Sequence, residues 1–218
     1  MSPRVADKIA LGMMAGWDVE GEVREGHFSS GAYPHLDPTR LLDDLAARPF
    51  GRETLFDPDA SAEALGILPT AEGALGAVIG TYSSFDGSAS ASEETNQVFL
   101  RLAALRKTKG LPPPQGIAEL DQETHRAAAA VKNGDDPGDV LQGLLRASVA
   151  HLQTGGVQGW AMSASTVKDL KFPSELLSLP NLQLAISVVH HKQAGSPWTQ
   201  LLVFVVILHL DGQGTAKA

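Results

Sequence analysis

The chain has 218 residues, a formal net charge of -8 and no cysteine. Its hydrophobic content of 43% is that of a globular protein able to bury one large core or two small ones, and it excludes a disordered chain. The negative charge argues against a nucleic-acid-binding surface, which requires clustered Lys and Arg. The absence of cysteine excludes disulfides and thiol chemistry.

The basic residues do not gather into a large patch. A local cluster falls at the end of a predicted helix, where we expect it to face water and complement the helix dipole: Arg101, Arg106, Lys107 and Lys109. Residues 1–16 lack the continuous apolar segment of a secretory signal. The longest apolar run, 201–208, is too short to cross a bilayer as a helix, and its β-branched residues predict a buried strand.

Two helices are predicted before residue 50. The spacing of apolar residues over 2–16 favours a short amphipathic helix. The segment 17–36 is acidic and shows no clear period, so we expect it to be irregular. Asp37 followed by Pro38 is typical of a helix N-terminus. The buried face of that second helix is predicted to consist of Leu41, Leu42 and Leu45.

A pair of strands is predicted over residues 64–68 and 74–82. The Gly- and Ser-rich segment that follows, 86–92, is typical of a linker, and we place a domain boundary there. The chain then divides into a unit at 1–86, a linker at 87–92, a second unit at 93–210 and a disordered tail at 211–218.

The second half predicts helices followed by a sheet. Three helices are expected: 93–109, 117–132 and one beginning at Pro137. A strand is expected at 157–163, with Trp160 in the core, and a long hairpin is formed by 182–190 and 200–210. Because the helices precede the strands without regular alternation, the pattern indicates an α+β fold in which helices pack on an antiparallel sheet.

Residues 106–114, Arg-Lys-Thr-Lys-Gly-Leu-Pro-Pro-Pro, resemble a signature of bacterial CAP domains, the superfamily of cysteine-rich secretory proteins, antigen 5 and pathogenesis-related 1. In that signature an Arg, three variable residues and Gly-Leu-x-Pro close the first helix, and an alanine-rich helix follows, as residues 127–130 do here. The turn at Pro180-Asn181 fits the same pattern. The resemblance implies an α-β-α sandwich, an extracytoplasmic location, and a protein, lipid or cell-surface partner.

The first half resembles the closing part of such a domain. Residues 48–60 are similar to the family's Ser-Pro-x-His-Arg-x-x-Leu-x-x-Pro segment. Leu65-Gly66-Ile67 falls where the family has its Gly-Val-Gly strand. The chain therefore suggests an internal duplication, with one partial CAP-like unit and one complete one.

The chemical residues of the family are mostly replaced. CAP domains often carry two histidines and two acidic residues in a central cleft, sometimes with a divalent metal. Here Gly51 stands in place of the His of the His-Arg pair, although Arg52 remains, and Val131-Lys132-Asn133 stands where a histidine is expected after Ala130. We therefore carry over no catalytic residue, no metal ligand and no cofactor.

The leading hypothesis is a non-catalytic binding or structural protein. One alternative is a metal-dependent hydrolase, for which the best local cluster is Glu22, His27 and His35. An irregular loop, however, provides no spacing that forces these side chains to converge.

Another alternative is a self-assembling or complex-forming component, including a homo-oligomer. Such a protein would use its edge strands or the tip of the final hairpin. The candidate partner contacts there are Trp198, His190 and His191. Because adjacent strand residues point to opposite faces, His190 and His191 are not expected to bind one ion together.

Overall fold

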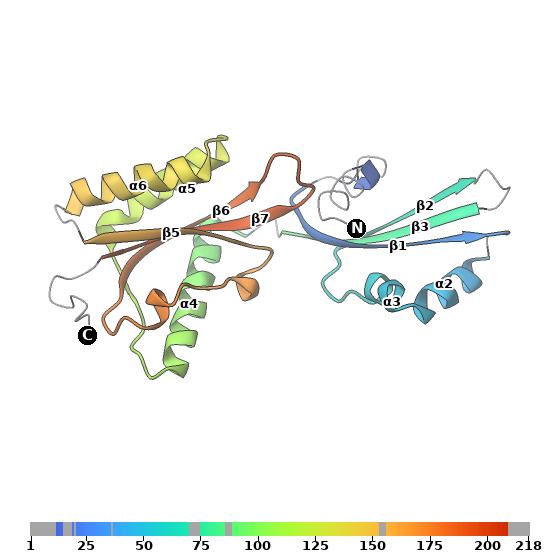
Figure 1. Cartoon of the computed structure of the whole chain (residues 1–218), viewed down its shortest axis with the longest axis horizontal. Coiled ribbons are helices and arrows are strands. Elements are labelled where there is room, and N and C mark those ends of the chain that lie inside the picture. The colour runs from blue at the N-terminus through green and yellow to red at the C-terminus, as the bar shows by residue number, and fades with distance from the viewer. Residues whose placement is uncertain are drawn as a thin grey trace, which may run out of the picture. The chain divides into compact units, whose positions relative to one another are not determined.

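The computed structural model describes residues 12–14, 19, 21–35, 37–69, 75–85, 89–152 and 156–208 (Figure 1). The chain forms two compact units. Unit 1 comprises Met1–Asp86 and Lys192–Thr199, and unit 2 comprises Gly87–His191 and Gln200–Ala218. Each combines helices with a sheet, so the predicted α+β class is confirmed. The expected tail at 211–218 and most of the expected helix at 2–16 lie outside the described residues.

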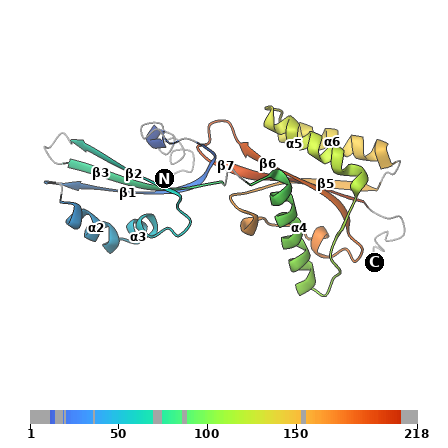
Figure 2. The same ribbon diagram turned by 180° about the vertical axis from the view of Figure 1, so that it is seen from behind.

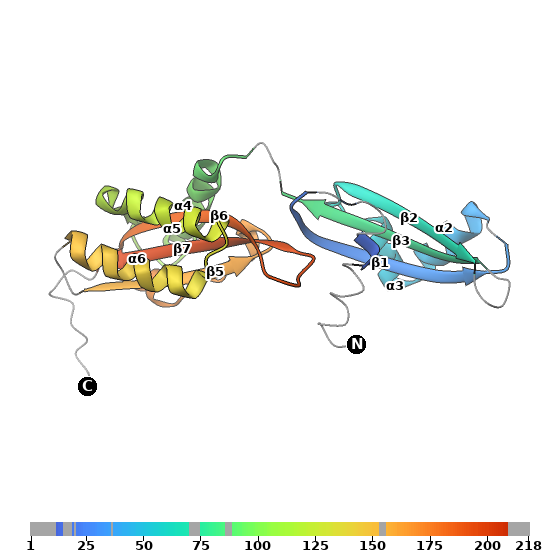
Figure 3. The ribbon, with the colours of Figure 1, turned by 90° about the horizontal axis from the view of Figure 1, so that it is seen from above.

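Unit 1 is built on a three-stranded sheet in the order β1-β3-β2, which Figure 3 shows side by side. Its strands are β1 (Val23–Tyr33), β2 (Ala62–Pro69) and β3 (Leu75–Ser84). The central strand β3 pairs antiparallel with both neighbours. The expectation of an irregular segment at 17–36 was wrong for β1. A bulge between Val23 and Glu25 shifts the alternation at the start of the strand, and residues 29–32, Ser-Ser-Gly-Ala, carry no large apolar side chain to mark a buried face.

Two helices cover one face of this sheet: α2 (Pro38–Ala47) and α3 (Pro49–Leu55) (Figure 1). Asp37 caps α2, because its carboxylate Oδ1 accepts a hydrogen bond from the backbone N–H of Thr39 at 3.0 Å. The predicted start of this helix is therefore confirmed.

Unit 1 has two small core clusters, one of which contains Met14, Val23 and Tyr82. The other lies between the helices and the sheet. Its buried members are Tyr33, Leu41, Leu45 and Ala77. Leu42, predicted to share this face, is instead 50% exposed. Successive helix residues are about 100° apart around the axis, and in α2 the buried face is centred on Leu41 and Leu45, which leaves Leu42 outside it.

Unit 2 has a four-stranded sheet in the order β4-β6-β7-β5. Its strands are β4 (Gln115–Gly116), β5 (Val157–Ala164), β6 (Gln183–Lys192) and β7 (Thr199–Leu208). Strand β7 lies inside the sheet between β6 and β5, and residues 201–207 are all buried, which confirms the predicted buried strand. Trp160, predicted to be core, is only partly buried, because β5 is an edge strand.

Helices lie on both faces of this second sheet, so unit 2 has three layers (Figures 1 and 2). Helix α4 (Ala91–Thr108) lies on one face, and α5 (Asp121–Lys132) and α6 (Pro137–Leu152) lie on the other. The main core packs α5 and α6 against β6 and β7 through residues that include Val131, Leu144 and Phe204. No helix in the described ranges is both long and apolar enough to span a membrane.

Helix α4 ends in a glycine-dependent corner. Gly110 has φ of 71°, in the left-handed region that glycine adopts without strain. The N–H of Gly110 donates to Lys107 O at 3.0 Å, and the N–H of Leu111 donates to Arg106 O at 3.1 Å. These two bonds form a Schellman motif, which satisfies the last carbonyls of the helix.

We expect Gly110→Ala to lower the free energy of unfolding by about 1–2 kcal/mol, because an L side chain strains this backbone conformation. The matched control is Gly143→Ala in the middle of α6, where an added Cβ meets no atom within 4 Å. That change should raise stability by about 0.5–1 kcal/mol through helix propensity. Urea unfolding followed by circular dichroism measures both. Equal effects of the two changes would contradict the assignment of Gly110 as a strained corner.

Candidate functional site

The largest fully buried side chain of the described residues is a cation, Arg106 of α4. Its guanidinium donates only to main-chain oxygens. Nε reaches Pro112 O at 2.9 Å, Nη1 reaches Leu176 O at 2.8 Å, and Nη2 reaches Leu179 O at 2.8 Å and Pro180 O at 3.3 Å. The side chain thus joins the end of α4 to the proline corner and to the segment that leads into β6.

The prediction that Arg106 faces water was wrong. Val98, Leu102 and Arg106 follow one another at four-residue intervals, so they share the buried face of α4. Burial lowers the pKa of Arg106. Because the ordinary pKa of arginine is very high, the guanidinium remains a cation at neutral pH. Since its donors are used by carbonyls, the guanidinium is a structural cross-link and is unavailable to an anionic ligand.

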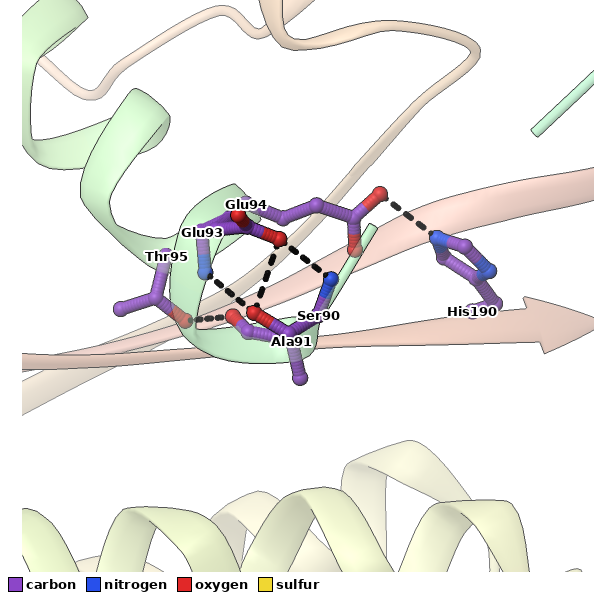
Figure 4. A network of polar contacts seen from close by, with 6 residues as sticks. All are labelled: Ser90, Ala91, Glu93, Glu94, Thr95 and His190. Atoms are coloured by element: carbon purple, nitrogen blue, oxygen red, sulfur yellow. Dashed lines mark hydrogen bonds and ion pairs between the residues drawn. The ribbon is translucent and has the colours of Figure 1, made fainter. Parts of the chain in front are cut away.

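A second buried polar contact in unit 2 joins α4 to β6. Glu94 in the first turn of α4 lies with its Oε1 2.8 Å from Nε2 of His190, and the two side chains are 11% and 15% exposed. Figure 4 shows Glu94 extending away from the helix start towards His190. A carboxylate that orients an imidazole is also the arrangement of a general base, so this pair is the first place to look for chemistry.

The neighbouring hydroxyls are engaged in capping α4 (Figure 4). Ser90 Oγ accepts from the N–H of Glu93 at 3.2 Å, and Glu93 Oε2 accepts from the N–H of Ser90 at 2.8 Å, which forms a capping box. Thr95 Oγ1 donates to Ala91 O at 2.7 Å. These bonds fix the helix start, and the buried Glu94–His190 pair fastens it to the sheet.

The structure separates the members of the proposed hydrolase cluster. Glu22 lies just before β1, His27 lies within it and His35 lies beyond its end. An eleven-residue strand spans about 35 Å, so the outer two side chains cannot meet at one ion. Within the described part of the chain, no group of three or more His, Asp or Glu side chains could hold a metal ion.

His27 instead has a neighbour that the sequence did not suggest. Its Nε2 lies 3.9 Å from Oδ2 of Asp57, whose side chain is 9% exposed. Asp57 is brought there by α3, which packs on β1, while His27 pairs across the sheet with Thr81. The hydroxyl of Thr81 and Oδ2 of Asp57 are buried without a hydrogen bond. The group is polar, but the long His27–Asp57 distance leaves it short of a formed catalytic dyad.

The predicted partner contacts at the hairpin tip have neighbours within the chain. Trp198 belongs to unit 1, where its ring lies 6.5 Å from that of Phe28. A Cβ added at Gly26 would lie 3.2 Å from Trp198 and 2.9 Å from Tyr82, so glycine makes room for these rings. Burial raises the pKa of Tyr82 to about 12.

His191 follows the Glu94-bound His190 on β6 and is partly exposed.

Apolar side chains are exposed unevenly. The described residues include seven large hydrophobic side chains at the surface, and five of these belong to unit 1: Leu42, Phe50, Phe56, Leu65 and Ile67. Leu65 and Ile67, which are 53% and 40% exposed, lie on strand β2. Among the described residues β2 pairs with β3 alone, so its outer edge presents unpaired backbone groups.

Comparison of the chain with protein-family models, with curated proteins and with solved structures finds no match.

We expect Arg106→Leu to lower the free energy of unfolding by about 3 kcal/mol or more, because four carbonyls, that of Leu176 buried and the others partly buried, lose a charged donor. Arg106→Lys should restore little of it, since an ammonium cannot reproduce the planar fork. Arg126→Leu is the control, because Arg126 is 63% exposed in a surface ion pair and should change stability by less than about 0.5 kcal/mol. A stable Arg106→Leu protein would contradict the cross-link.

A double-mutant cycle tests whether Glu94 and His190 are energetically joined. The changes Glu94→Gln and His190→Gln should show a coupling free energy of about 1–3 kcal/mol, as expected for a buried bond with an ionisable partner. The surface pair of Glu123 and the 63% exposed Arg126 provides the comparison and should couple by less than about 0.5 kcal/mol. Additive effects of the Glu94 and His190 changes would contradict a fastening role.

Proposed function

We propose that this is a non-catalytic binding or structural protein, in which unit 2 is a rigid scaffold and unit 1 binds a partner. The observation that carries this proposal is the concentration of exposed apolar side chains on unit 1, two of them on the outer strand β2. Large apolar side chains at a surface are typical of interaction sites. By contrast, the buried polar side chains of α4 in unit 2 bond within the unit.

The kind of surface favours a polypeptide partner. An open strand edge offers alternating N–H and C=O groups, which another extended chain can pair with, and a lipid cannot supply that pairing. Leu65 and Ile67 are two residues apart and therefore point to the same side of β2. They would contact alternate side chains of an added strand. Of the protein, lipid and cell-surface partners that the CAP resemblance implies, we therefore propose a protein, outside the cytoplasm.

The hydrolase alternative has less support. It required Glu22, His27 and His35 to act together, and strand β1 holds them apart. The contact between His27 and Asp57 would need to shorten by about 1 Å to become a hydrogen bond. The buried His190–Glu94 pair has little access for a substrate.

Selection from a random decapeptide library against the immobilised full chain tests the proposal. We expect enrichment of peptides with alternating apolar residues and no proline, because these add best to a strand edge. The variant Ile67→Lys should weaken binding of the enriched peptides about tenfold or more, since a lysine on an edge strand disfavours pairing.

The matched control is Leu100→Lys. Leu100 is an apolar residue of α4 in unit 2 with 58% exposure, so the same change at that position should leave peptide binding intact. Failure to enrich any strand-like peptide, or equal binding to the Ile67→Lys variant, would contradict partner binding through β2.

A further inference from the structure

The two outer strands of unit 1 differ in how their free edges are protected. On β1 the bulge between Val23 and Glu25 interrupts the regular backbone. Further along, Arg48 Nη1 donates to Ser30 O at 3.1 Å, which occupies a carbonyl of that strand. Bulges and covering side chains are devices that prevent strand addition.

Within the described part of the chain, strand β2 shows none of these protections. Its eight residues pair with β3 in a continuous register without a bulge. It contains no Lys or Arg, and its one proline is the last residue, Pro69. An eight-residue apolar edge of this kind is a template for another strand.

We propose that the strand added to β2 is β2 of a second copy of this chain, so that the protein forms a two-fold dimer through unit 1. The pairing is antiparallel and centred on Gly66. Residue 66 therefore faces residue 66 of the other copy, residue 65 faces residue 67, and residue 63 faces residue 69. This inference rests on the proposed function, because it names the partner of the same edge.

The register follows from side-chain complementarity. With Gly66 at the centre, Leu65 of one copy faces Ile67 of the other, and the reverse pair lies beside it. Leu65 and Ile67 pair across the sheet with Ile79 and Ala77, which lie in the core under the helices. The four exposed side chains therefore meet on one side of the joined sheet, next to the helices of both copies.

Charge favours the same register. Glu63 is the only charged residue of β2, and in this pairing it faces Pro69 at the end of the other strand. Centring on Leu65 would place each Glu63 opposite Ile67, and centring on Ala64 would place it opposite Leu65. Both of those arrangements place the carboxylate against one of the two large apolar side chains inside the seam, whereas Pro69 is the exposed last residue of the strand, where the carboxylate keeps its contact with water.

The symmetry explains why a second copy suits this edge. A two-fold interface uses the same surface on both chains and closes on itself, which removes the exposed edge from both sheets at once. Pairing converts two three-stranded sheets into one six-stranded sheet, 3 + 3 strands, with β2 in its interior. It also covers Leu65 and Ile67 of both copies.

Single-cysteine cross-linking tests both the dimer and its register, because the natural chain has no cysteine. In the variant Gly66→Cys the two new thiols face each other. Directly opposite residues of an antiparallel pair have Cα atoms about 4.5–5.5 Å apart, within the range of a disulfide. We expect a disulfide-linked dimer to form under mild oxidation.

Two control variants separate this contact from random collision. In Glu63→Cys the two thiols would be about 20 Å apart along the paired strands, because residue 63 faces residue 69. Leu100→Cys places an exposed thiol on unit 2. Neither should cross-link at the rate of Gly66→Cys. If Gly66→Cys does not fold, mixing Leu65→Cys and Ile67→Cys chains should give the mixed disulfide faster than either variant alone.

Sedimentation equilibrium of the unmodified chain completes the experiment. A dimer together with fast Gly66→Cys cross-linking supports the inference. A monomer at all concentrations, or a dimer whose Gly66→Cys variant links no faster than Leu100→Cys, overturns it. If the chain is a monomer and the selected peptides still require Ile67, the self-pairing fails and the proposed function stands; if neither is found, both fail.

Discussion

The fold of unit 2 depends on one buried cation. Arg106 donates four hydrogen bonds to carbonyls in the proline corner and in the segment before β6, and no apolar side chain could satisfy those oxygens. The end of α4, the corner and the entry to β6 are thereby held in one arrangement. The Glu94–His190 pair fastens the other end of α4 to the same strand. Helix α4 is thus attached to the sheet of unit 2 near both of its ends.

Unit 1 leaves more of its large apolar side chains at the surface than unit 2 does. Its core under α2 and α3 contains few residues, and its outer strand β2 leaves Leu65 and Ile67 partly in water. A second small cluster, formed by Met14, Val23 and Tyr82, also belongs to unit 1, and neither cluster covers Leu65 and Ile67. Covering the β2 edge would therefore stabilise this unit further. Because unit 1 exposes more of its large apolar side chains than unit 2 does, we propose that the partner binds to unit 1.

The sequence predicted the features whose signals are local. Asp37 before Pro38 marked the start of α2, the Gly110 corner marked the end of α4, and the apolar run at 201–208 marked β7. Features that depend on distant residues were missed. The acceptor of Arg106 at Leu176 lies 70 positions away, and Asp57 reaches His27 only because α3 packs on β1. No local pattern encodes either contact.

Hydrogen exchange of the full chain, measured at low and at high protein concentration, tests the central claim most directly. Self-pairing along β2 predicts that the outer-edge amides of residues 62–68 exchange more slowly as concentration rises, while amides of β1 are unchanged. Exchange in β2 that is the same at both concentrations would contradict a second copy at this edge.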